Sequence, residues 1–362
     1  MKKVFIAATK QNDGKTTVSL GLISNFQNIF KKVAFIKPIG QRYLEEEGLK
    51  IDEDSWLIEE VCGIKCGLKD MSPIAVEKGF TEKYLDRPDK RSITREIKEA
   101  FRRVSKGQDM VIIEGTGHAG VGSVFDHSNA TVAKLIGAKV IIISSGGIGR
   151  PIDEIVLNKA LLEKEGVKVL GVIVNKVLPE KFDKISRLVR KGLMRKGIDL
   201  LGIIPYTPML SDPTIEQILE ETDFELLCGK DYLENSVSHV MIGAMEPHNA
   251  IKSIVDDTLL ITPGDREDMI IAALGRRRQD NDKRLKVSGM ILSCGIIPDE
   301  SIMDLLNQAQ IPVLSTKCDT YTVTSRVHDL TVKLRPQDTN KIKTVVKLIK
   351  DNVDLNKILK GI

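Results

Sequence analysis

The sequence predicts an α/β protein in which a doubly wound, mostly parallel sheet is followed by a second, smaller α/β domain. Short apolar runs rich in β-branched residues alternate with helix-length amphipathic segments along the chain. Most of these runs are apolar at nearly every position, which is typical of strands covered on both faces. A polar stretch at 221–236 interrupts the alternation. The chain has 362 residues, enough for about two or three domains.

Six apolar runs are predicted to form the first sheet. These strands are expected at 4–8, 33–38, 110–115, 139–144, 169–175 and 200–205. Because helix-length segments separate them, the strands should be parallel and joined by right-handed connections. We assign 1–220 to this first domain and 221–236 to a linker.

A shorter α/β series follows the polar stretch. Its strands are expected at 237–243, 258–264, 287–293, 311–316 and 330–334. We assign 237–340 to this second domain. The remaining residues, 341–362, form an amphipathic terminal helix that either packs on the second domain or contributes to a dimer contact. The charge-dense stretch 276–284 is predicted to be a solvated turn and not a nucleic-acid contact.

Composition and charge exclude several classes of partner. The chain carries 54 Lys and Arg residues against 50 acidic residues, and a formal charge of +4 gives no reason to expect nucleic acid. The longest apolar runs are far shorter than the roughly 20 residues of a membrane span. Five scattered cysteines are typical of reduced thiols and not of a disulfide framework. We therefore expect a cytoplasmic protein without a membrane or nucleic-acid partner.

The strongest chemical signal follows the first predicted strand. Residues 8–17 read ATKQNDGKTT, which is a P-loop pattern in which Thr9 replaces the first glycine. Backbone N–H groups of 12–16 should point into one concavity at a helix N-terminus, where a polyphosphate is favoured. The residues predicted to bind the nucleotide here are Asn12, Asp13, Gly14, Lys15, Thr16 and Thr17.

Each polar side chain of this loop has a predicted role. Lys15 should reach the β- and γ-phosphate oxygens of ATP, and the Thr16 hydroxyl should bind Mg²⁺. The alternative is a lysine that happens to follow a turn glycine before a helix. Lys10 stands where the deviant Walker A subclass carries its signature lysine. In that subclass a lysine of a second subunit completes the site, so Lys10 is either a sign of a homodimer or an exposed loop lysine.

Several spaced motifs resemble dethiobiotin synthetase over roughly 1–217 and imply its P-loop NTPase fold. They are Lys15-Thr16-Thr17, Lys37-Pro38, Glu114-Gly115, Asn175 and Ile204-Pro205. The likeness extends to the synthetase domain of cobyrinic acid a,c-diamide synthase. It is closer to the non-catalytic N-terminal region of long phosphate acetyltransferases, where this domain precedes a DRTGG domain. The segment 262–268 resembles the DRTGG signature without its trailing glycines, and 311–323 resembles its later part.

The resemblance implies a set of site residues. Thr16, Glu114 and Asp54 would hold Mg²⁺, with Asp52 as the alternative to Asp54. A carboxylate such as Glu114, at the end of an apolar strand, can face the phosphate crevice. Asn175 would recognise the adenine base, and its amide offers both a donor and an acceptor.

Three lysines are the predicted catalytic residues. Lys37 would bind a substrate carboxylate or the transferred phosphoryl group, next to Lys15 and Lys10. Pro205 would lie in the nucleotide site.

The loop 115–135 departs from the synthetase pattern. There His118 is either a substrate contact or an ordinary loop histidine, and Arg150 is placed near the same sheet edge. In the second domain, the turn Gly264–Arg266 opens a helix; either it binds a small anion or a second nucleotide, or Asp265 caps that helix.

Two related activities are not expected. The chain has no Gly-x-Cys-x-Gly elbow of a glutaminase. An acetyltransferase domain would need several hundred residues beyond 362.

The function predicted from these observations is Mg·ATP binding under the control of a C-terminal regulatory domain. The reaction would be phosphoryl transfer to a carboxylate or carbamate, or slow ATP hydrolysis. The substrate would be a small carboxylate or amine. The alternative is a non-catalytic nucleotide sensor that acts on a metabolic enzyme such as a phosphate acetyltransferase. Steady-state turnover distinguishes the two.

Overall fold

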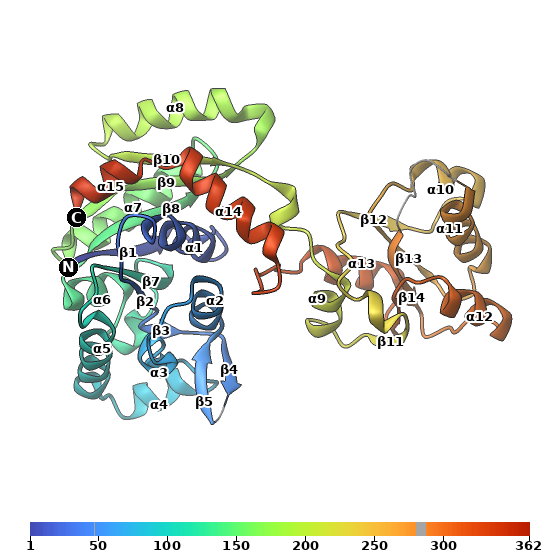
Figure 1. Cartoon of the computed structure of the whole chain (residues 1–362), viewed down its shortest axis with the longest axis horizontal. Helices are drawn as coiled ribbons and strands as arrows, with labels where there is room; N and C mark the ends of the chain where they lie inside the picture. The colour runs from blue at the N-terminus through green and yellow to red at the C-terminus, as the bar shows by residue number, and fades with distance from the viewer. Residues whose placement is uncertain (47, 280–286) are drawn as a thin grey trace. The chain divides into compact units, whose positions relative to one another are not determined.

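The computed structural model describes residues 1–46, 48–279 and 287–362, and it contains two compact units (Figure 1). Unit 1 comprises Met1–Tyr206 and Leu334–Ile362, and unit 2 comprises Thr207–Lys333. The structure therefore separates the units earlier than the predicted boundary at 220, and it returns the C-terminal segment to unit 1. The predicted turn at 276–284 lies partly outside the described residues.

Unit 1 is built on six parallel strands in the order β10-β9-β8-β1-β7-β2, with helices on both faces (Figure 1). They are β1 (Lys2–Ala8), β2 (Val33–Ile36), β7 (Met110–His118), β8 (Lys139–Ser145), β9 (Val169–Val177) and β10 (Leu200–Pro205). All six predicted strands are confirmed. The strand β1 lies between β7 and β8, so its carboxyl end opens at the centre of the sheet edge where α/β proteins bind ligands.

Helices and two small sheets complete unit 1. The helices are α1 (Lys15–Phe26), α2 (Glu53–Cys62), α3 (Leu68–Met71), α4 (Phe80–Asp86), α5 (Lys90–Ser105), α6 (Asn129–Ile136), α7 (Arg150–Lys164), α8 (Phe182–Arg195), α14 (Thr339–Asn352) and α15 (Leu355–Gly361). The small sheets pair β3 (Ile39–Gly40) with β6 (Ile74–Ala75), and β4 (Tyr43–Glu46) with β5 (Leu49–Asp52). No helix of the described residues is long and apolar enough to cross a membrane.

The C-terminal helices pack on unit 1, which the sequence did not predict; of its two alternatives, packing on the second domain is replaced by packing on α1, and the dimer contact stays a prediction. In Figure 1 the helix α14 lies beside α1. A side chain at Gly21 of α1 would overlap Ile349, and the Asn25 amide donates to the Val346 carbonyl over 3.0 Å. The predicted single helix is broken at Val353, which is extended and bridges to Gly202. Because α1 is covered by α14 as well as by the sheet, every residue from Val18 to Ile23 is buried.

Unit 2 contains a five-stranded sheet in the order β11-β15-β14-β13-β12. The strands are β11 (Glu225–Cys228), β12 (His239–Ile242), β13 (Thr258–Pro263), β14 (Val287–Ser293) and β15 (Val313–Ser315). The helices are α9 (Ile215–Glu220), α10 (Pro247–Ser253), α11 (Glu267–Gln279), α12 (Glu300–Gln308) and α13 (Thr320–His328). Four strands are parallel, and β11 pairs with β15 in the antiparallel direction.

Two predictions for unit 2 are wrong. The stretch 221–236 is not a linker, because it contains β11 and the buried Phe224. The strand is the short run ELLC, and the residues on both sides of it are largely polar. The stretch 330–334 forms no strand in the described structure. Its backbone is used differently, since the Lys333 carbonyl accepts a hydrogen bond from the Gln217 side chain over 2.8 Å.

Gly264 follows β13 at a point where no side chain fits. A Cβ at this position would overlap the backbone carbonyl oxygen of Ile296. We expect Gly264→Ala to destabilise unit 2 by about 2 kcal/mol, because backbone has to move to relieve the overlap. Urea unfolding of the full chain measures this. The control is Gly275→Ala in α11, where nothing lies within 4 Å and alanine should be neutral or stabilising. Equal effects of the two substitutions would contradict the prediction.

Candidate phosphate-binding site

The loop between β1 and α1 has the backbone conformation of an anion-binding concavity. Asn12 and Gly14 both adopt left-handed conformations, with φ values of 62° and 96°. Gly14 precedes α1, and among the residues that the structure describes no side-chain hydrogen bond caps this helix. In the described part of the chain, the N–H groups of Asp13 and Gly14 donate no hydrogen bond. Alternation of left- and right-handed residues turns successive N–H groups into one hollow, so these donors are available to an anion.

Thr9 stands where this loop usually has a glycine, and its side chain is hydrogen-bonded inside the loop. Its hydroxyl donates to Asp13 Oδ2 over 2.7 Å, and the Lys10 N–H donates to the same oxygen over 3.0 Å. Asp13 is 1% exposed, and burial raises the pKa of its carboxyl group, whereas the Thr9 hydrogen bond opposes the rise. The Asp13 side chain therefore braces the loop from within, and only its backbone is left to bind a ligand.

Lys15 is a half-buried cation. Among the described residues its ammonium forms no ion pair and no hydrogen bond. Burial lowers its pKa, Lys37 lowers it further, and the charge of Glu114 opposes the shift. A desolvated ammonium beside unbonded N–H groups is a strong site for an anion.

Thr16 and Glu114 meet at the base of the loop. The Thr16 hydroxyl donates to Glu114 Oε1 over 3.0 Å, and Glu114 is fully buried. Burial, together with the nearby charge of Asp54, raises the pKa of Glu114 to about 7. Its second oxygen, Oε2, has no hydrogen-bond partner among the described residues. An unpaired carboxylate oxygen beside a hydroxyl fits Mg²⁺, which prefers hard oxygen ligands.

The protein offers Mg²⁺ only part of a coordination shell. No group of three His, Cys, Asp or Glu residues in the described chain is arranged to hold a metal ion. Mg²⁺ commonly keeps water ligands and substrate phosphate oxygens beside one or two carboxylates. The pair formed by Thr16 and Glu114 agrees with that pattern.

Lys37 is bound to the two carboxylates that the sequence offered as alternatives. Its ammonium lies 2.9 Å from Asp52 Oδ1 and also donates to Asp54. Burial alone would lower the pKa of Lys37, but the charges of Asp54 and Asp52 hold it well above its usual range. Asp52 also accepts from the Asp54 N–H at the start of α2. The Asp52 side chain is 1% exposed, against 19% for Asp54. Asp52 is therefore the buried, structural carboxylate of the pair, and Asp54 is the more accessible one.

Asn175 and Lys176 approach the loop from the end of β9. The Asn175 side chain donates to the Asp13 carbonyl over 2.9 Å, and the Lys176 ammonium donates to the Asn12 carbonyl over 2.8 Å. The predicted base-recognition role of Asn175 stays a prediction, because one N–H of its amide is bound to the loop. Sequence reasoning missed Lys176. Its place directly after Asn175 was the available signal.

The other predicted residues differ in how they relate to this site. Lys10 is exposed on the loop, Thr17 lies in the first turn of α1, and Pro205 ends β10 beside β9. His118 ends β7 in register with Ala8, at the same sheet edge as the loop.

Arg150 is 78% exposed and pairs with Glu154 within α7 over 2.6 Å. Arg150 begins α7 after β8, and its guanidinium is paired within that helix.

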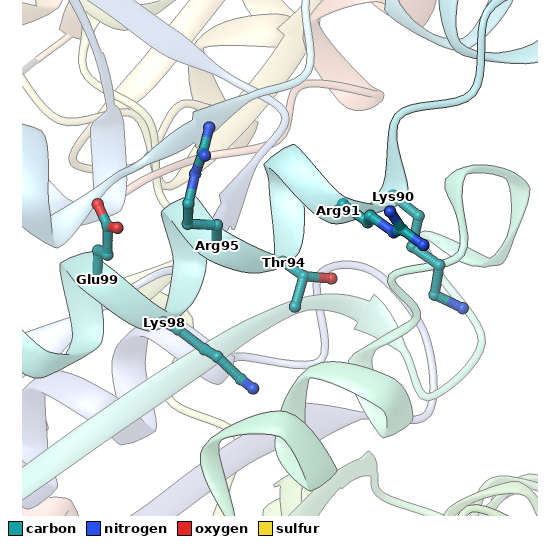
Figure 2. Close-up of a pocket in the computed structure, with 6 residues that line it drawn as sticks. All are labelled: Lys90, Arg91, Thr94, Arg95, Lys98 and Glu99. Atoms are coloured by element: carbon teal, nitrogen blue, oxygen red, sulfur yellow. The ribbon is translucent and has the colours of Figure 1, made fainter.

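A second feature, which the sequence did not predict, is a shallow hollow of about 560 Å³ on the outer face of α5 (Figure 2). Its lining residues are Lys90, Arg91, Thr94, Arg95, Lys98 and Glu99. Figure 2 shows Arg95 and Glu99 extending to one side of the helix and Thr94 and Lys98 to the other. Because these side chains do not converge, we assign no site there.

In unit 2, the Arg266 side chain of the turn Gly264–Arg266 is bound to nearby protein groups. The Arg266 guanidinium donates to the carbonyls of Gly243 and Met245 over 3.1 and 3.2 Å, and it pairs with Asp268. This arginine is therefore used to fix the loop after β12.

Comparisons with known proteins also divide the chain into two consecutive domains. The AAA domain family matches residues 2–214, and the DRTGG domain family matches residues 217–330. A phosphate acetyltransferase of Pseudomonas putida is 27% identical over 98% of this chain and 51% of its own length. One from Synechocystis is 25% identical over the same shares. The chain spans about half the length of the curated relatives it matches.

Solved structures are similar at a lower level. The MinC:MinD cell division protein complex of Aquifex aeolicus is 18% identical with a TM-score of 0.38, covering 58% of this chain and 84% of that one. MinD of Pyrococcus horikoshii, complexed with Mg-ADP, is 17% identical with a TM-score of 0.37, covering 58% of this chain and 83% of that one.

The two family matches, together with the phosphate acetyltransferases that align with the chain, confirm the predicted likeness to a region of long phosphate acetyltransferases. The chain therefore belongs to the AAA domain family through residues 2–214, followed by a DRTGG domain.

Proposed function

We propose that this protein binds Mg·ATP in the loop between β1 and α1. The observation that carries the proposal is Lys15, a half-buried ammonium near the charge of Glu114 that forms no hydrogen bond and no ion pair among the described residues. A buried charge is costly unless it is paired, so the site favours an anionic ligand. A triphosphate would pair with Lys15 and would accept from the N–H groups of Asp13 and Gly14.

Thr16 and Glu114 would hold the metal ion, which neutralises phosphate charge when it is bound. Asp54 would have to loosen its ion pair with Lys37 to give that oxygen to the metal, because Asp54 Oδ2 is bound to the Lys37 ammonium. Lys37 would keep its contact with Asp52, 2.9 Å away, and its remaining N–H groups could bind a substrate carboxylate or the transferred phosphoryl group. In this proposal the carboxylate pair Asp52 and Asp54 couples metal binding to the availability of Lys37.

The reaction that this arrangement supports is transfer of the γ-phosphoryl group to the oxygen of a small carboxylate or carbamate, with ADP as the leaving group. Water as the acceptor gives slow ATP hydrolysis. Positioning by Lys15 and Lys37 would provide most of the acceleration. We place the protein in the cytoplasm, where Mg·ATP is available. The exposed Lys10 would complete the phosphate site of a second copy in a homodimer.

A second candidate function is a nucleotide sensor that regulates a phosphate acetyltransferase, with the DRTGG domain transmitting the bound state. One observation favours it: the DRTGG domain family matches residues 217–330, directly after the domain that carries the phosphate loop. In that case the nucleotide would bind without stimulated turnover.

The test is calorimetric titration of the full chain with ATP, with and without Mg²⁺, followed by an assay of ADP release. We expect saturable binding that strengthens when Mg²⁺ is present. Absence of binding under both conditions overturns the proposal. ADP release stimulated by one member of a panel of small carboxylates and amines supports the enzyme, whereas tight binding without stimulation supports the sensor.

A further inference from the structure

Two consecutive carbonyl groups of the phosphate loop are held from outside by side chains of β9. The Asn12 carbonyl accepts from Lys176 Nζ over 2.8 Å, and the Asp13 carbonyl accepts from Asn175 Nδ2 over 2.9 Å. The donors are adjacent in sequence, and so are the acceptors. β9 therefore grips the loop at two successive peptide groups.

The direction of a carbonyl fixes the direction of the next N–H. In a trans peptide group the C=O and the N–H lie in one plane and point in opposite directions. With the Asn12 carbonyl turned to Lys176, the Asp13 N–H points the other way. With the Asp13 carbonyl turned to Asn175, the Gly14 N–H does the same. These two N–H groups donate no hydrogen bond within the described residues.

The backbone around the two contacts is shaped to allow them. A Cβ at Gly14 would overlap Asn175 Nδ2, so the glycine gives the amide its access to the loop. Lys176 itself is left-handed, with a φ of 58°, which is uncommon for a residue with a side chain. Such conformations persist where the surrounding structure requires them, and they cluster at functional sites.

We propose that Asn175 and Lys176 are positioning residues that turn the Asp13 and Gly14 N–H groups toward the polyphosphate before it binds. The inference rests on the proposed nucleotide binding and deepens it. It gives Asn175 a role in phosphate binding, exerted through the loop, which is different from the predicted contact with the base. Lys176 acquires a role that the sequence did not suggest. The ligand class that this device serves is any polyphosphate, with or without a base.

Magnesium tripolyphosphate, which has no base, separates the two roles of Asn175. The variants are Asn175→Ala, Lys176→Met and Lys176→Arg, with Lys98→Met on the outer face of α5 as the matched control. We expect Asn175→Ala and Lys176→Met each to weaken tripolyphosphate binding by about tenfold or more, because each frees one carbonyl that orients a donor to a charged ligand. Lys176→Arg should stay within about threefold of wild type, and Lys98→Met should bind unchanged.

A direct readout distinguishes positioning from general destabilisation. In a ¹⁵N-glycine-labelled chain, the Gly14 amide resonance should shift on addition of tripolyphosphate, and this shift should shrink in Asn175→Ala. Calorimetry gives the affinities for the same samples, and thermal unfolding shows that the variants fold.

Each outcome has a defined meaning. If Asn175→Ala weakens ATP but leaves tripolyphosphate unchanged, Asn175 recognises the base and its positioning role is overturned. If Lys176→Met binds tripolyphosphate like wild type, the role of Lys176 is overturned. If the wild-type chain binds neither ligand, the proposed function itself fails. Wild-type binding with unaffected variants leaves nucleotide binding intact and overturns only this inference.

Discussion

A chain in which methionine replaces Lys15 should bind Mg·ATP at least about 100-fold more weakly than wild type. The ammonium would make charge-assisted hydrogen bonds to two phosphate oxygens, each worth roughly 1.5–3 kcal/mol. The same substitution should leave the ligand-free protein as stable as before, or more stable. Burial disfavours the charged form of Lys15 more than the nearby charge of Glu114 favours it, and Lys15 forms no hydrogen bond or ion pair among the described residues. Calorimetric titration gives the affinity, and thermal unfolding without nucleotide gives the stability.

The opposite responses of affinity and stability make this result specific. Lys98→Met removes an exposed cation of the same size on α5, and it should change neither measurement. A Lys15→Met protein that binds Mg·ATP like wild type would show that the loop does not bind a triphosphate. A marked loss of stability would show that Lys15 has a structural partner, contrary to the ligand-free geometry.

The parallel sheets were predictable because buried parallel strands have the most distinctive sequence pattern. Most of the runs predicted as strands of unit 1 are nearly all apolar, and helix-length segments separate them. The edge strand β11 escaped prediction because its sequence, ELLC, sits within a polar stretch that reads as a linker. The terminal helices are amphipathic, which predicts that one face is buried. The amphipathic pattern does not say against which surface, and here the surface is α1.

The loop was predictable despite its missing glycine because the strand, the Gly14-Lys15-Thr16 run and the helix occur in the required order. What the pattern does not contain is the reason that Thr9 is tolerated. That reason is a contact between residues four apart, in which the Thr9 hydroxyl bonds to the buried Asp13 carboxylate. The resemblance likewise selected Glu114 as a metal ligand, and the buried, unpaired oxygen of Glu114 agrees with that role.

The pairing of Lys37 was not predictable from the motifs. The sequence placed Lys37 and Asp54 in one site with separate tasks, and the fold binds them to each other. Side chains that are 17 residues apart and close in space form whichever ion pair the backbone permits, and a linear pattern does not show it. The contacts of Asn175 and Lys176 with the loop are of the same kind, since they connect segments more than 160 residues apart.

Replacing Glu114 by glutamine should stabilise the metal-free protein at pH 8 and leave its stability at pH 5 nearly unchanged. The pKa of Glu114 in the folded chain is raised to about 7, chiefly by burial, from an ordinary value of 4.5. The folded state therefore holds the proton more tightly than the unfolded state does. The stability associated with the protonated form is fully present below pH 4.5 and is lost as the pH rises through 7.

The size of this effect follows from the shift. A difference of 2.5 units between the two pKa values corresponds to at most about 3 kcal/mol at pH 8. Glutamine is neutral at every pH, so it removes this part of the pH dependence. Urea unfolding of both proteins at pH 5, 6, 7 and 8, in the presence of a chelator, measures the difference. Glu99→Gln on the surface of α5 is the matched control and should follow the wild-type curve.

Mg·ATP should reverse the order of the two proteins. At pH 8 the ionised Glu114 of wild type supplies the carboxylate that the metal needs, so Mg·ATP should raise the unfolding midpoint of wild type. The glutamine variant lacks that charge and should gain much less. An equal gain in both proteins would remove Glu114 from the metal site, and a wild-type stability that rises between pH 5 and 8 relative to the variant would contradict its raised pKa. The expected result, a larger gain for wild type, would show that Glu114 lowers stability in the empty site and is required when Mg·ATP binds.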